Sequence, residues 1–232
     1  MQLTPEQVEV RLRLARDFPF YAENALKIRT KDLAIEPLRL NEAQRYFHRK
    51  IEEQRERTGK VRAIVLKGRQ QGLSTYTGAR FYHEVTHGRA LRALVMAHKS
   101  DSAKTLFDMT HRYHQRCPEI LKPHTKYASR RELWFDRLDS SYMVATAGGE
   151  GIGRGETFTH QHLSELAFWA PNSAEDNYNA LRQALSGSDG TMQIIESTAN
   201  GIGNLFHGLW ESASRGDSEL LPIFIPWFWQ PE

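Results

Sequence analysis

The sequence predicts an α/β protein whose mostly parallel sheet carries helices on both faces and includes some antiparallel strands. Short apolar, β-branched segments alternate with longer segments of helical spacing along most of the chain, which is the pattern of such a sheet. A glycine-rich turn joins one of these strands to the helix after it. The chain of 232 residues, 40% of them apolar, is long enough to bury one sizeable core.

The first elements are predicted from spacing and caps. Residues 4–16 and 41–58 have helical spacing, with Pro5 near the start of the first helix and Asn41 as a cap for the second. Residues 61–66 are short, apolar and β-branched, which predicts a buried strand.

The later elements follow from the same criteria. Strands are predicted at 91–97, 131–135, 142–145, 192–196 and in a segment that ends near 163. Helices are predicted at 74–85, 100–115, 175–185 and from about 204. The final segment, LLPIFIPWFWQPE, is expected to begin as a strand.

Composition argues against a membrane-spanning or secreted protein. No window approaches the roughly 20 uninterrupted apolar residues of a membrane span. The N-terminal MQLTPEQVEV lacks the basic-then-apolar layout of a secretory signal. Cys117 is the single cysteine, so no internal disulfide can form, which fits a reducing compartment. We therefore expect a cytoplasmic protein with no membrane partner.

Charge is distributed unevenly along the chain. Residues 1–137 carry 28 Lys and Arg against 16 Asp and Glu, whereas residues 138–232 carry 3 against 12. This asymmetry allows a basic face for a polyanion beside an acidic face. Ordinary solvated helix faces account for the same counts equally well.

A glycine-rich segment, KGRQQGLST at residues 67–75, directly follows the first predicted strand. It has the outline of the phosphate-binding loop G-x-x-x-x-G-K-[ST], whose backbone N–H groups surround phosphates. Gly72 occupies the second glycine position, and Ser74 occupies the position of the hydroxyl that holds Mg²⁺. Leu73 replaces the usual lysine, while Lys67 stands at the first glycine position.

The cation of this loop is therefore relocated rather than lost. Lys67 has a flexible side chain that can arch back to a γ-phosphate, and Arg69 offers a second cation with a planar fork. A strand-to-helix turn without any ligand is the alternative reading. The residues predicted to bind nucleotide are Lys67, Gly68, Arg69, Gln70, Gln71, Gly72, Leu73, Ser74 and Thr75.

Two further motifs stand at the ends of later predicted strands. In THQHLSELAFW, Glu165 has the position of a carboxylate that directs an attacking water, and Ser164 replaces the aspartate that usually precedes it. In ESTANG, at 196–201, hydroxyl and amide side chains can contact both a phosphate and that carboxylate. Taken singly, these motifs also fit a solvated carboxylate and a turn. Together they converge on the carboxyl edge of one sheet, where open α/β folds bind ligands.

With these motifs the chain resembles the ATPase domain of the tailed-bacteriophage terminase large subunit, the motor that packages viral DNA into a procapsid. The resemblance covers most of residues 35–230 and depends on GRQQGLST, LSELAFW and STANG. It implies a P-loop NTPase fold of the ASCE type. It also implies a helical, lid-like segment at residues 1–40 and the ATPase domain at 41–232.

The resemblance also implies residue roles. Catalysis would involve Lys67, Arg69, Glu165 and Arg154, the last as an arginine finger that reaches a neighbouring subunit's site. Gln44 would read adenine, and Ser74 and Ser164 would hold Mg²⁺. Ser197, Thr198 and Asn200 would couple hydrolysis to movement.

The same resemblance implies ATP and Mg²⁺ as cofactors and double-stranded DNA, a portal protein and a small terminase subunit as partners. The family implies a homo-oligomeric ring when assembled, a monomer in isolation, and the cytoplasm of an infected bacterial host as location. We expect the nuclease domain of the family to be absent from this chain and expect no DNA cleavage by it.

Two other functions remain open at the level of sequence. One is a helicase-like or other nucleic-acid-remodelling ATPase, which would separate strands rather than move along intact duplex. The other is a non-catalytic DNA-binding or assembly module in which Leu73 and Ser164 mark a degenerate nucleotide site. Mg²⁺-dependent ATP turnover distinguishes the module from both motors.

Overall fold

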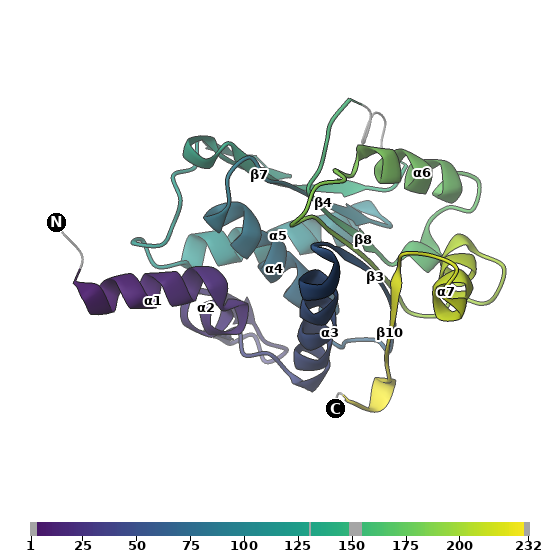
Figure 1. Cartoon of the computed structure of the whole chain (residues 1–232), viewed down its shortest axis with the longest axis horizontal. Coiled ribbons are helices and arrows are strands. Elements are labelled where there is room, and N and C mark those ends of the chain that lie inside the picture. The colour runs from purple at the N-terminus through teal and green to yellow at the C-terminus, as the bar shows by residue number, and fades with distance from the viewer. Residues whose placement is uncertain (1–3, 130, 149–154, 230–232) are drawn as a thin grey trace.

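The computed structural model describes residues 4–129, 131–148 and 155–229, and within them an eight-stranded sheet forms the centre (Figure 1). The strand order is β10-β3-β9-β8-β4-β7-β6-β5. Six neighbouring strands are parallel: β10 (Leu221–Ile225), β3 (Val61–Lys67), β9 (Met192–Ser197), β8 (His160–Ser164), β4 (Arg92–Ala97) and β7 (Ser140–Thr146). The edge strands β6 (Glu132–Phe135) and β5 (Tyr127–Ala128) are antiparallel. The predicted fold class is confirmed.

Helices cover both faces of this sheet (Figure 1). On one face lie α3 (Glu42–Thr58), α4 (Leu73–His87) and α5 (Ser100–Arg116), and on the other lie α6 (Ala174–Ala184) and α7 (Leu205–Arg215). Alternate residues of each strand therefore enter two separate cores. On β9, for example, Ile194 belongs to the core under α4, whereas Ile195 belongs to the core under α6 and α7.

The strand order has a direct consequence for function. Strand β9 lies between β3, which leads into the glycine-rich loop, and β8, which leads into Glu165. Because parallel strands end at a common edge, Lys67, Ser164 and Ser197 finish side by side.

The N-terminal region contains elements that the periodicity did not reveal. Helix α1 (Pro5–Arg16) was predicted, but α2 (Phe18–Ala25) and the hairpin of β1 (Lys27–Arg29) and β2 (Ile35–Pro37) were not. Phe18 and Tyr21 of α2 pack against His83 of α4, so this region shares the core of the sheet. The lid-like role of residues 1–40 stays a prediction.

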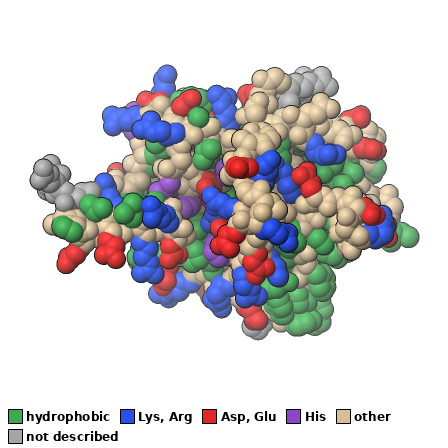
Figure 2. All heavy atoms as spheres, in the orientation of Figure 1, with side chains coloured by type: hydrophobic (Ala, Val, Ile, Leu, Met, Phe, Trp, Pro, Cys, Tyr) green, Lys and Arg blue, Asp and Glu red, His purple; other side chains and the backbone are tan. Residues whose placement is uncertain are grey.

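The short 3₁₀ helices η1 (Asp136–Leu138), η2 (Leu166–Phe168) and η3 (Trp227–Trp229) complete the described elements. Figure 2 shows apolar side chains gathered on the surface near the end of β10. The exposed aromatic residues of this segment are Phe224, Trp227 and Phe228. Within the described ranges, no helix combines the length and the apolar character that crossing a bilayer requires.

Buried histidines predict a loss of stability in acid. Burial, and then neighbouring His87, lower the pKa of His83 to about 3. The unfolded chain therefore takes up a proton at His83 near its ordinary pKa, while the folded chain does not. The contribution of His83 to stability is present above its ordinary pKa of about 6.5 and is lost as the pH falls towards about 3; at pH 5 the loss from this residue is about 2 kcal/mol.

We expect His83→Gln to remove this share of the acid sensitivity. Urea unfolding at pH 7 and pH 5 measures it, because the variant loses less free energy of unfolding than wild type between these two values. A second pair of measurements at pH 7 and pH 8, where neither state binds the proton, serves as the control. Equal losses in both proteins between pH 7 and pH 5 would show that His83 carries the same charge in the folded and the unfolded chain, which would contradict this prediction.

Candidate nucleotide site

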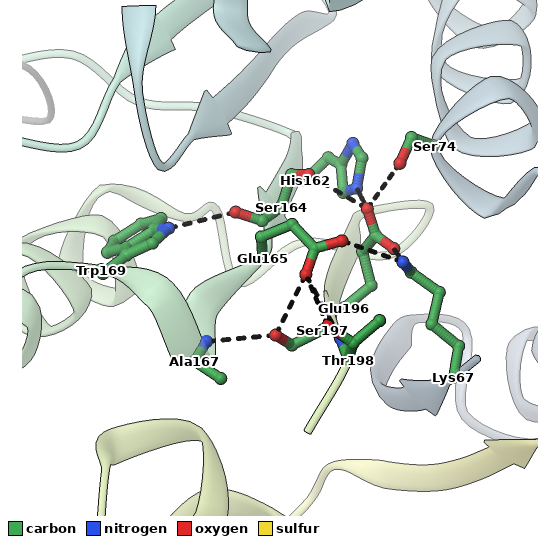
Figure 3. A network of polar contacts seen from close by, with 10 residues as sticks. All are labelled: Lys67, Ser74, His162, Ser164, Glu165, Ala167, Trp169, Glu196, Ser197 and Thr198. Atoms are coloured by element: carbon green, nitrogen blue, oxygen red, sulfur yellow. Dashed lines mark hydrogen bonds and ion pairs between the residues drawn. The ribbon is translucent and has the colours of Figure 1, made fainter. Parts of the chain in front are cut away.

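The three predicted motifs meet at the carboxyl edge of the sheet (Figure 3). Lys67, Ser164 and Ser197 are the last residues of β3, β8 and β9. Ser164 pairs in register with Glu196 on the neighbouring strand. In-register residues on parallel strands project from the same face of the sheet, so this pairing sets the side chains next to each other.

Lys67 is the centre of a buried ion-pair network. Its Nζ lies 3.0 Å from Oε1 of Glu165 and 3.1 Å from Oε2 of Glu196. The Lys67 side chain is only 7% exposed. Burial by itself lowers the pKa of Lys67, but the two carboxylates outweigh it and raise the pKa above its ordinary value. The lysine therefore stays charged inside the protein.

Glu196 is a member of this network to which the sequence analysis assigned no role. Its side chain is fully buried, and its Oε1 accepts hydrogen bonds from Ser74 at 2.7 Å and Ser164 at 3.1 Å. His162 Nε2 lies 3.1 Å from the same oxygen. Burial alone raises the pKa of Glu196, yet Lys67 and these hydrogen-bonding neighbours hold it well below its ordinary value.

Glu165 stands at a strained point of the backbone. Its φ is 53°, in the left-handed region that residues other than glycine rarely adopt. Oε2 accepts from the hydroxyl of Ser197 at 3.3 Å and from the backbone N–H of Thr198 at 3.2 Å. Strain of this kind collects at active sites, where the surroundings fix it.

The ESTANG segment contacts two different groups, the Glu165 carboxylate and the backbone of Ala167. Ser197 and Thr198 hold Glu165, as just described, whereas Asn200 donates to the backbone oxygen of Ala167 at 2.9 Å. Ser197 also accepts from the N–H of Ala167 at 3.3 Å. The segment therefore grips both the Glu165 carboxylate and the η2 turn that follows it. The coupling role of these residues stays a prediction.

The glycine-rich loop opens onto a cavity of about 540 Å³. Among the residues that line it are Lys67, Gln70, Ser74, Thr75, Ser164 and Glu165. Helix α4 begins at this cavity without a side-chain cap, so its first N–H groups are available to an anion. Leu73, at the usual lysine position, is instead buried in the core under α4. The lysines among the described residues that line the cavity are Lys67 and Lys99, whereas Leu73 lines it without supplying a charge.

Two glutamines brace the loop, Gln44 from α3 and Gln71 from within the loop itself. Gln44 Nε2 donates to the backbone oxygen of Gly72 at 2.7 Å, and its Oε1 accepts from the N–H of Asn41 at 3.0 Å. Gln71 donates to the backbone oxygen of Trp227 at 3.0 Å. In this structure the Gln44 amide is engaged by the protein itself, and its reading of adenine stays a prediction.

Arg69, the described one of the two predicted arginines, does not join this network. Arg69 is exposed and is not among the described residues that line the cavity. Arg154 lies outside the described residues. The roles of both arginines stay predictions. The cation that the structure brings to the carboxylates is Lys67.

Gly68 is the point at which the loop touches the segment after β10. A Cβ at Gly68 would lie 2.5 Å from Cα of Trp227, a contact with backbone that cannot be relieved by a side-chain rotation. We expect Gly68→Ala to displace the loop, to lower the free energy of unfolding by about 1–3 kcal/mol, and to weaken nucleotide binding. Chemical unfolding and ADP titration measure the two effects.

Gly208→Ala is the matched control for this substitution. Its added Cβ would meet open space within helix α7, so it should leave nucleotide binding unchanged and raise helix stability by about 0.5–1 kcal/mol. Equal behaviour of the two alanine variants would contradict a tight contact at Gly68.

The oxygen atoms at this edge suit Mg²⁺. This ion prefers hard oxygen ligands and keeps several of its waters. The hydroxyls of Ser74 and Ser164 line the cavity and converge on one buried carboxylate, Glu196. Among the described residues, the second oxygen of that carboxylate, Oε2, has no hydrogen-bond partner of good geometry, and it lies 3.1 Å from Nζ of Lys67. The donor set fits the ion that the fold class implies.

No protein-family model matches the sequence. Solved structures do match. The large terminase of bacteriophage HK97 is 13% identical with a TM-score of 0.74, covering 90% of this chain and 43% of that one. The large terminase ATPase domain of Thermus phage P74-26 is 17% identical with a TM-score of 0.56, covering 75% and 79%. The large terminase of the thermophilic bacteriophage D6E is 11% identical with a TM-score of 0.57, covering 81% of this chain and 46% of that one.

The chain thus spans less than half the length of the HK97 and D6E proteins that it matches. At these identities the shared property is the fold. The chain has the fold of phage large-terminase ATPase domains, as the three motifs predicted.

Proposed function

We propose that this chain is a Mg²⁺-dependent ATPase that drives double-stranded DNA into a viral procapsid. One observation carries the proposal: Lys67 and Ser74, near the two ends of the glycine-rich loop, meet Glu165, which follows the distant strand β8, at a cavity beside the uncapped start of α4. This combination supplies a cation, a metal-binding hydroxyl, a carboxylate and backbone donors for phosphate, which are the parts that phosphoryl transfer requires.

In this mechanism the α4 N-terminus and the loop N–H groups hold the phosphates of ATP. Lys67 turns from Glu165 to the γ-phosphate and keeps its contact with Glu196, since an ammonium group has three protons to donate. Ser74 and Ser164 hold Mg²⁺, which when bound compensates the charge on the β- and γ-phosphates.

The departure of Lys67 frees one oxygen of Glu165. That oxygen accepts a proton from a water in line with the γ-phosphorus, and Ser197 and Thr198 keep the carboxylate in place. The water oxygen bonds to phosphorus as the bond to the β,γ-bridging oxygen breaks, which yields ADP and phosphate. Loss of the γ-phosphate returns Lys67 to Glu165, and the ESTANG segment transmits this change to η2.

The buried network favours a working enzyme over a degenerate module. Burying a lysine with two carboxylates is energetically unfavourable relative to an apolar cluster of the same size. A module that has lost turnover has no use for such a cluster at the edge of its sheet. Leu73 and Ser164 each have a counterpart that supplies the missing charge, Lys67 and Glu196.

The role in packaging draws on the matched proteins, which are phage large terminases. Partners on this proposal are duplex DNA, a portal protein and a small terminase subunit, and the assembled form is a homo-oligomeric ring in an infected bacterium. A helicase-like motor would need the same ATPase site, so the site alone does not separate the two.

The test combines ATP turnover with movement on DNA. We expect phosphate release that requires Mg²⁺ and, with portal and procapsid present, protection of duplex DNA from nuclease. Strand separation without packaging would favour the helicase-like function. Absence of turnover and of nucleotide binding in both the isolated and assembled protein would leave the non-catalytic module.

Arg154 is proposed to complete the site of a neighbouring subunit. Arg154→Ala and Glu165→Gln subunits should each be inactive, since each lacks one part of every site. Mixed under assembling conditions, they should regain turnover, because some interfaces then combine an intact Arg154 with an intact Glu165. An inactive mixture, under conditions in which wild-type subunits assemble, would argue against action between subunits.

A further inference from the structure

We infer that Glu196 takes the place of the aspartate missing at Ser164 and is the carboxylate that positions the magnesium-binding hydroxyl of Ser74. This inference rests on the proposed function, because it concerns the metal of the same site. It makes Glu196 a positioning residue, one strand closer to the phosphate loop than the usual carboxylate.

The sheet register provides the geometric basis. Glu196 on β9 pairs directly with Ser164 on β8, and on its other side it pairs with Val65 on β3. Neighbouring strands lie about 4.8 Å apart. Moving the acid from position 164 to position 196 therefore shifts it by one strand spacing and keeps it at the same level of the sheet and on the same face.

The contacts of Glu196 are those that a metal-positioning carboxylate needs. The shortest hydrogen bond to it comes from the Ser74 hydroxyl, at 2.7 Å. Ser164 donates to the same oxygen at 3.1 Å. A hydroxyl that donates to a buried carboxylate is fixed in direction, with its lone pairs turned away from the acid and towards the cavity.

A purely structural role explains these contacts less well. The Glu196 carboxylate is fully buried, and its Oε2 has no well-formed hydrogen bond among the described residues. A buried ion pair is seldom a gain over packed apolar side chains. Lys67 already has Glu165 as a partner at 3.0 Å, so its charge alone does not call for Glu196.

The relocated acid and the relocated lysine form one arrangement. Lys67 places the cation of the loop at the end of β3 instead of at position 73. Glu196 places the acid on β9, beside β3, instead of on β8. Nζ of Lys67 and Oε2 of Glu196 therefore lie 3.1 Å apart. Two departures from the common pattern, Leu73 and Ser164, thus compensate within a single site.

The test measures Mg²⁺ binding in the complex with ADP, where no turnover occurs. A fluorescent ADP analogue is titrated into wild type and Glu196→Gln, first with EDTA and then over a range of Mg²⁺ concentrations. Glutamine keeps the shape and can still accept from Ser74, but it carries no charge. We expect similar ADP binding in EDTA and a half-saturating Mg²⁺ concentration about 10- to 100-fold higher in the variant.

The decisive measurement uses a double variant that places a carboxylate on β8, at position 164, and removes the one at position 196. In Ser164→Asp/Glu196→Gln we expect the half-saturating Mg²⁺ concentration to recover towards the wild-type value, which loss of packing or of an ion pair at Lys67 does not explain. Bound Mn²⁺, counted by electron paramagnetic resonance in the same ADP complexes, gives a second readout. Glu165→Gln, which removes the other partner of Lys67, should leave Mg²⁺ affinity near that of wild type.

An unchanged Mg²⁺ requirement in Glu196→Gln overturns the inference, as does a double variant that shows no recovery. If Glu196→Gln does not fold, the double variant decides alone: Mg²⁺-dependent ADP binding supports the inference, and its absence, or a failure to fold, counts against it. If wild type binds ADP equally well with and without Mg²⁺, this inference is wrong but the proposed function is not contradicted. Wild type that binds no nucleotide under any condition removes the proposed function itself.

Discussion

Replacing Lys67 by methionine is expected to reduce ATP turnover about 10³-fold, because the γ-phosphate loses its cation. Methionine keeps the apolar stem but supplies no charge to the γ-phosphate. It also leaves the fully buried Glu196 without its cation. Removing one partner of a buried pair costs about 3–5 kcal/mol of unfolding free energy. Phosphate release and urea unfolding measure the two effects.

Lys104→Met is the matched control. Lys104 is an exposed residue of α5 and is not among the described residues that line the nucleotide cavity. The same change there should alter stability by less than about 0.5 kcal/mol and leave basal turnover in place. Near-normal turnover in a folded Lys67→Met protein would mean that another group serves the γ-phosphate.

Glu165→Gln is expected to lower turnover by about 10²- to 10⁴-fold, the range for loss of a general base. The amide still accepts from Ser197 and Thr198 but cannot take a proton from water. Because Glu165 is partly exposed and Lys67 keeps Glu196, the change in unfolding free energy should be about 1 kcal/mol or less. Nucleotide should bind as tightly as in wild type or more tightly, since Lys67 is released from one partner.

Glu175→Gln tests whether the loss is specific. Glu175 is an exposed carboxylate in the first turn of α6, so its substitution should affect neither turnover nor binding. Single-turnover assays with excess enzyme separate the chemical step from product release. Wild-type turnover in Glu165→Gln would exclude this carboxylate as the base.

Much of the site was predictable because its parts lie at strand ends. The predicted strands around 61–66 and 192–196 were found within one residue of their boundaries, and β8 ends one residue beyond the predicted position. Parallel strands share an edge, so the sequence could place Lys67, Glu165 and Ser197 at one edge of the sheet. Their direct contact depends on β3, β9 and β8 being neighbours, which the sequence did not show.

Glu196 could not be assigned in the same way. It follows MQII in a fully buried strand, and its contacts depend on β9 lying between β3 and β8, a long-range pairing that local spacing does not encode. The available signal was an acidic residue inside a predicted buried strand, which requires a buried partner. Ser164 on its own suggested a weakened metal site, whereas the register reveals its neighbour.

The N-terminal region was missed for a different reason. Helix α2 has eight residues, too few for a clear helical period, and β1 and β2 have three residues each. Their stability comes from tertiary contacts such as those of Phe18 and Tyr21 with α4. Gln44 was recognised as a notable residue, but its contact with the Gly72 backbone depends on how α3 packs beside the loop.

The central claim is that Lys67 supplies the charge that Leu73 cannot. A crystal structure of the chain with Mg²⁺ and a non-hydrolysable ATP analogue tests it directly. We predict Lys67 Nζ at about 2.7–2.9 Å from a γ-phosphate oxygen, the distance of a charge-assisted hydrogen bond, with Glu165 released from it. A bound analogue whose γ-phosphate lies out of reach of Lys67, while Nζ remains between Glu165 and Glu196, would contradict it.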